Sequence, residues 1–94
     1  MSWNSIKKYI EDTLCFVQNE LDDNAVEAVR HYLENAEYEM AFEGLIIEIM
    51  NLKYRPAIDW DECRKVGIEL GLNQDSVFKI DFWERFENYI SSVS

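Results

Sequence analysis

Apolar residues recur along the chain at the three- and four-residue spacing of amphipathic helices. The first such stripe comprises Ile6, Ile10, Thr13, Leu14, Val17 and Leu21. We therefore expect a first helix from about Ser2 to Glu20. An all-β domain would need a turn roughly every ten residues. Three Gly and one Pro in 94 residues supply too few turns for that.

Two further helices are predicted before the single proline. Asp22-Asp23-Asn24 offers side-chain acceptors to cap the first of them. Its expected buried stripe is Ala25, Val29, Tyr32, Leu33 and Ala36. A break near Asn35 precedes a third helix over about 37–53, whose predicted core face is Tyr38, Ala41, Phe42, Leu45, Ile49 and Leu52. Pro56 marks its end, because the residue before a proline is driven out of helical geometry.

The last third of the chain predicts a fourth helix and a final helical region. Asp59 and Glu62 form a capping box that starts the fourth helix, and Gly71 ends it. Its core face comprises Trp60, Cys63, Val66, Gly67 and Leu70. The final region starts at Asp75 or Ser76, with an aligned stripe of Phe78, Phe82, Phe86, Tyr89 and Val93.

A second capping box, Asp81 with Glu84, would divide the final region into a short turn and a separate helix. In that helix the periodicity places Phe82 at the centre of the buried face and Trp83 at its edge. Together the segments predict an all-α fold, a compact single-domain bundle of five or six helices over residues 1–94.

The third predicted helix has an apolar back as well as an apolar core face. Met40, Gly44 and Ile47 occupy this back, and the acids that flank the apolar stripe are Glu37, Glu39, Glu43 and Glu48. A surface helix is normally polar at such positions. Two interpretations stay open: the other helices bury this helix on both sides, or its back forms an exposed apolar floor ringed by acids.

The chain is strongly acidic, with 19 Asp and Glu against 9 Lys and Arg and a formal net charge of −10. This charge argues against direct binding of nucleic acid, because contacts to phosphates depend on Lys and Arg. Residues 20–48 carry nine acids and one Arg, a local charge of −8. Such a field attracts a basic protein.

The sequence offers little to catalysis or metal binding. His31 is the only imidazole, so a Ser or Cys nucleophile has few possible bases. Glu27, His31 and Glu34 share a helix face, but one His with two acids is a weak metal signal that intrahelical pairing also explains. Cys15 and Cys63 are expected to be reduced, with Cys63 buried. We expect no enzyme, no metal and no cofactor.

The sequence also predicts a cytoplasmic location. The chain does not open with the uninterrupted apolar run of a signal peptide. It contains no run of about 18 apolar residues that could span a membrane. Two cysteines are fewer than the disulfide framework of a small secreted domain requires.

Two motifs resemble a known family. The segment from His31 to Leu45, HYLENAEYEMAFEGL, resembles the helical immunity proteins of the MafI type, which are CdiI-like. Asp81–Phe86, DFWERF, is similar to their C-terminal motif, and the chain length and helix order also fit. The resemblance implies a role in polymorphic toxin systems such as contact-dependent growth inhibition. Immunity proteins of this kind protect the producing cell by binding a toxin domain, and many of these toxins are nucleases.

Charge and resemblance together predict an immunity protein that neutralises a cognate toxin C-terminal domain, a basic ribonuclease or other nuclease, as a 1:1 heterodimer. Its carboxylates would occupy the site that receives phosphates. The predicted partner-binding residues are Asp22, Asp23, Glu27, Glu34, Glu37, Glu39 and Glu43. Two alternatives stay open: an acidic helical adaptor or homodimer without a toxin partner, and a small enzyme or metal protein that uses His31.

Overall fold

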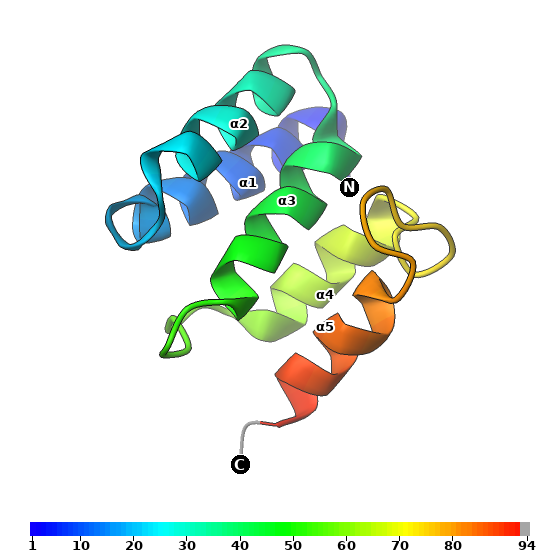
Figure 1. The fold of residues 1–94 in the computed structure, drawn as a ribbon. Helices are drawn as coiled ribbons and strands as arrows, with labels where there is room; N and C mark the ends of the chain where they lie inside the picture. The colour runs from blue at the N-terminus through cyan, green and yellow to red at the C-terminus, as the bar shows by residue number, and fades with distance from the viewer. Residues whose placement is uncertain (93–94) are drawn as a thin grey trace.

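The structure, a computed structural model, describes residues 1–92 and has the all-α architecture that the periodicity predicts. Its helices are α1 (Trp3–Val17), α2 (Asp23–Glu34), α3 (Tyr38–Met50), α4 (Trp60–Glu69) and α5 (Phe82–Ser91), with a 3₁₀ turn η1 (Gln18–Glu20). In Figure 1 the α1–α2 hairpin lies on one side of α3, and α4 and α5 lie on the other. Val93, the predicted end of the last apolar stripe, lies outside the described residues.

The helix at the centre of the bundle is α3, which packs against all four other helices. Its buried residues are Ala41, Phe42, Glu43, Leu45, Ile46 and Ile49. This arrangement decides between the two interpretations of its apolar back, because the back is covered. Met40, Gly44 and Ile47 are all half-buried, and Ile47 packs against the core. Among the described residues, no helix has the length and hydropathy needed to cross a membrane.

Side-chain caps start both helices of the α1–α2 hairpin. The Ser2 hydroxyl accepts the N–H of Ser5 at 3.1 Å, and the Asp22 carboxylate accepts the N–H of Asn24 at 2.8 Å. Helix α1 ends at Val17, earlier than predicted, because the chain tightens there into η1. The predicted cap of α2 is therefore confirmed, and the end of α1 is corrected.

The predicted buried stripe of α2 is partly wrong. Its buried residues are Val26, Val29 and Leu33. Ala36, predicted in this stripe, is exposed and has a φ of 56°, the left-handed conformation that ends a helix. The N–H of Glu37 donates to the carbonyl of Tyr32 at 2.8 Å across this turn. Ala36 thus reverses the chain between α2 and α3 instead of filling the core.

Helix α4 begins and ends where the sequence predicts. The Asp59 carboxylate accepts the N–H groups of Asp61 and Glu62, each at 3.1 Å. Gly71 has a φ of 77°, which glycine adopts without the steric penalty of a Cβ, and the helix stops there. Both ends follow from local side-chain and backbone preferences.

The predicted helical start at residues 75–76 is wrong. Residues 71–81 form a non-helical connection, and α5 begins at Phe82. The predicted division into a turn and a separate helix is confirmed, because Asp81 is the N-cap residue of α5. Its side chain makes no capping hydrogen bond, so the predicted capping box itself is wrong. The backbone N–H groups of the connection donate instead to the Glu43 carboxylate of α3. The Glu43 carboxylate, far away in the sequence, therefore accepts the N–H groups that a helix in this segment would have paired locally.

Aromatic side chains hold α5 against the core. The rings of Phe82 and Phe86 stack with 5.7 Å between their centroids, and both are buried. Trp83 is half-buried at the edge of this face, as its phase on the helix predicts. Arg55 closes the far end of α5, because its guanidinium donates to the carbonyl of Tyr89 at 2.6 Å. Periodicity gave no signal for this last contact, which joins residues far apart in the chain.

We predict opposite stability effects for alanine at two helical glycines. A Cβ at Gly67 would lie 2.7 Å from Cζ3 of Trp83, so Gly67→Ala should lower the free energy of unfolding by about 1–3 kcal/mol. A Cβ at Gly44 would meet Phe78 at an ordinary 3.6 Å, so Gly44→Ala should raise it by up to about 1 kcal/mol through helix propensity. Urea unfolding measures both. Equal effects would show that α4 and α5 do not pack this closely.

Candidate protein-binding surface

The carboxylate of Glu43 is a structural acceptor in the interior of the protein. Its side chain is 0% exposed. One carboxylate oxygen accepts the N–H of Val77 at 2.7 Å, and the other accepts those of Phe78 at 2.7 Å and Lys79 at 3.0 Å. Hydrogen bonds of this kind compensate the loss of water around a buried acid. Glu43 thereby ties α3 to the α4–α5 connection.

This burial corrects the assignment of Glu43 to the partner-binding surface. A carboxylate with no exposed area and three internal donors cannot meet a partner's charge. Its sequence context contains a signal for the structural role: residues 39–47 hold no Lys or Arg, and Phe42, Leu45 and Ile46 surround it with apolar positions. An acid so placed cannot form an intrahelical ion pair, and it needs donors from another segment.

The other six predicted contact residues lie at the surface, on α2 and around the start of α3. Asp22, Asp23, Glu27 and Glu34 are exposed, and Glu37 and Glu39 are half-buried. We call these six residues the acidic face. Asp23, Glu27 and Glu34 lie on α2, and Asp22 caps it. The helix is about 18 Å long at 1.5 Å per residue. The acidic face is therefore one continuous stretch of the chain, from the cap of α2 to the first turn of α3.

The acidic face is not neutralised internally. The ion pairs among residues 1–92 involve Asp12, Asp61, Glu69 and Glu87, and none involves the six acids of this face. Arg30, the one Arg or Lys of α2, donates to the side-chain oxygen of Gln18 at 2.6 Å. Asp22 keeps a structural role as the α2 cap. The remaining five carboxylates stay available to an external cation.

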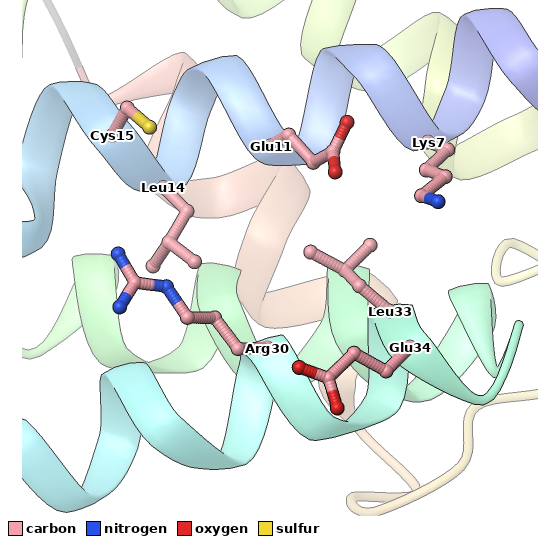
Figure 2. Close-up of a pocket in the computed structure, with 7 residues that line it drawn as sticks. All are labelled: Lys7, Glu11, Leu14, Cys15, Arg30, Leu33 and Glu34. Carbon is pink, nitrogen blue, oxygen red and sulfur yellow. The ribbon is translucent and has the colours of Figure 1, made fainter.

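A shallow groove of about 260 Å³ runs between α1 and α2 beside the acidic face. Figure 2 shows Leu14 and Leu33 directed into it from opposite helices, with charged side chains around them. Lys7 and Arg30 balance Glu11 and Glu34 in its lining. Glu34 therefore belongs both to the acidic face and to the edge of this groove.

The side chains considered for catalysis do not form a cluster. His31 is exposed, and its Nε2 lies 3.5 Å from the Asn35 amide. Residues 1–92 contain no group of three His, Cys, Asp or Glu side chains that could hold a metal ion. Cys15 is an exposed free thiol and Cys63 a buried one. Burial raises the pKa of Cys63 to about 12, so this thiol stays protonated at neutral pH.

Comparison of the chain with protein-family models, curated proteins and solved structures found no match.

We predict that removing one acceptor from Glu43 loosens the α4–α5 connection. In Glu43→Gln an amide N–H₂ would face a backbone N–H, so unfolding should become easier by about 2–3 kcal/mol. Amide exchange at Val77, Phe78 and Lys79 should accelerate more than exchange within α1. Glu48→Gln is the matched control on α3, because Glu48 is half-buried and accepts no hydrogen bond from residues 1–92. Similar changes in both variants would contradict the role of Glu43.

The two thiols should differ sharply in reactivity. At pH 8 iodoacetamide should modify Cys15 in the native protein and reach Cys63 only after unfolding, as counted by mass spectrometry. The raised pKa also sets a direction for stability. The unfolded thiol loses its proton near pH 9.0, and the folded one near 12. Its stabilising contribution is therefore full below about pH 9 and is lost as the pH rises towards 12. Native-state modification of both thiols would contradict this.

Proposed function

We propose that this chain is an immunity protein that binds a cationic toxin domain, a nuclease, and blocks its active site with carboxylates. The observation that carries the proposal is the acidic face, whose carboxylates make no internal ion pair within residues 1–92. A nuclease site is basic because it receives phosphates, and an acidic helix can occupy it in their place. The MafI-type motifs of the sequence point in the same direction.

The rigidity of α2 supports this function physically. The helix is capped by Asp22 and packed on α3 through Val26, Val29 and Leu33. The backbone positions of its acids are therefore fixed before a partner arrives, which reduces the backbone entropy lost on binding. A net charge of −10 also accelerates the encounter with a basic protein and opposes self-association.

An acidic adaptor without a toxin partner is the second candidate function. The observation that favours it is a set of exposed apolar side chains outside the acidic face, among them Phe16, Phe78 and Ile80. Such side chains serve any protein-binding module. The two functions differ in the partner's activity, because only an immunity protein suppresses a toxin.

The deciding experiment is co-expression with the product of the gene immediately upstream, which the proposal expects to encode the toxin domain. The proposal expects a stable 1:1 complex on size-exclusion chromatography and restored growth of cells that produce the toxin. A toxin that remains free and lethal in the presence of this protein would overturn the proposal.

We predict that the association rate with that toxin domain depends on the acidic face. The triple variant Glu27→Lys, Glu34→Lys and Glu37→Lys should associate at least about tenfold more slowly at low salt. These residues make no side-chain hydrogen bond within residues 1–92, so circular dichroism should be unchanged. Wild-type association should slow as salt rises, because the Debye length is about 10 Å at 0.1 M.

The matched control reverses three exposed acids on the other side of α3, Asp61, Glu69 and Glu84. It changes the net charge by the same amount and should slow association much less. Equal slowing by both triple variants would mean that total charge, and not the acidic face, steers the encounter.

A further inference from the structure

The segment from Asp75 to Ile80, which we call the strap, exposes three apolar side chains. Val77 is 41% exposed, Phe78 47% and Ile80 101%. An isolated surface apolar residue is ordinary, but three within four consecutive positions of a non-helical segment are not explained by packing inside the protein. The strap therefore presents apolar area that the fold itself does not use.

The strap is nevertheless held in place. Glu43 accepts the N–H groups of three consecutive residues, Val77, Phe78 and Lys79. The ring of Phe78 lies 5.9 Å from that of Tyr32 between centroids, and its edge would touch a Cβ at Gly44. A surface segment so constrained offers its side chains at low conformational cost on binding.

The strap and the outer side of α2 form one continuous surface. Phe78 lines a shallow hollow with Ala28, Tyr32 and Glu48, and Ala28 and Tyr32 also line the next hollow, with Glu27 and His31. Phe78 also lines a third hollow, with Asp75 and Ile80. An apolar centre is thus bordered by the carboxylates of Glu27, Glu48 and Asp75.

We propose that the strap is the apolar anchor of the interface, and that its occupant is a protein with a basic rim around an apolar pocket. This inference rests on the proposed function, since it deepens the description of the same partner. Phe78 and Ile80 would enter the pocket, and Lys or Arg of the rim would pair with Glu27, Glu48 and Asp75. Interfaces commonly combine a buried aromatic centre with a charged border in this way.

Charge decides between this partner and a second copy of the chain. A second copy would place the acids Glu27, Glu48 and Asp75 against an equally acidic molecule of net charge −10. The repulsion between like charges opposes that arrangement, whereas a basic rim is attracted by it. The occupant that fits is therefore a cationic protein.

The test measures both rate constants of binding to the purified upstream-encoded toxin domain by surface plasmon resonance. An apolar anchor acts after the encounter, so Phe78→Ser and Ile80→Ser should each accelerate dissociation about tenfold or more, with little change in association. Ile80 is fully exposed, so its substitution leaves the fold intact even if Phe78→Ser weakens the packing on Tyr32. Phe16→Ser is the matched control, because Phe16 is 62% exposed on α1; it should change neither rate.

The outcomes separate this inference from the proposed function. Tight toxin binding that survives both strap variants would overturn the anchor and leave the immunity function standing. No binding by the wild-type protein would overturn both. Sedimentation equilibrium across micromolar concentrations completes the test: a wild-type dimer that Ile80→Ser dissociates would assign the strap to a second copy and overturn the cationic partner.

Discussion

The buried carboxylate of Glu43 is the interaction on which the rest of the structure depends. Most of α3 is apolar, and one acid at its middle would be unstable there without donors. The backbone N–H groups of Val77, Phe78 and Lys79 supply them, and they are free to do so because residues 71–81 are not helical. The same hydrogen bonds therefore satisfy the acid and tie the α4–α5 connection to α3.

The central position of α3 follows from the apolar residues around its surface. Helix α3 has apolar residues on all sides, so it is stable only when other helices cover it. The α1–α2 hairpin covers one side, and α4 and α5 cover the other (Figure 1). Gly67 lets Trp83 of α5 approach α4 closely, and the Arg64–Glu87 ion pair at 2.7 Å joins the same two helices.

Glu43 is buried in the central helix α3, whereas the acids of the acidic face lie at the surface. Glu43 and the acidic face are close in sequence, but their environments differ. Glu43 is fully buried and accepts three hydrogen bonds, whereas the acids of the acidic face lie at the surface without an ion pair. In the proposed interface these two environments cooperate. The exposed acids would steer the proposed basic partner, while the buried one fixes the strap that would anchor it.

The sequence by itself determined the features that depend on neighbours within a few residues. Helical spacing identified five helices, Asp22 and Asp59 identified two caps, and Gly71 identified an end, because each of these is a local hydrogen-bond or backbone preference. The phase of Phe82 against Trp83 was also readable, since both lie on one helix. The motif resemblance and the charge distribution supplied the functional hypothesis in the same local way.

Tertiary structure alone decided the features that join distant residues. On a helical wheel Glu43 flanks the apolar stripe of α3, and its donors, 34 to 36 positions later, are what allow it to be buried. Because of the same contacts, Phe78 lies in the non-helical connection and not on the last helix. Because the chain reverses at Ala36, Ala36 is exposed and not part of the α2 core. Helical periodicity describes which side a residue faces on one helix. It contains no information on which segment of the chain will meet that side, and this depends on the packing of the whole bundle.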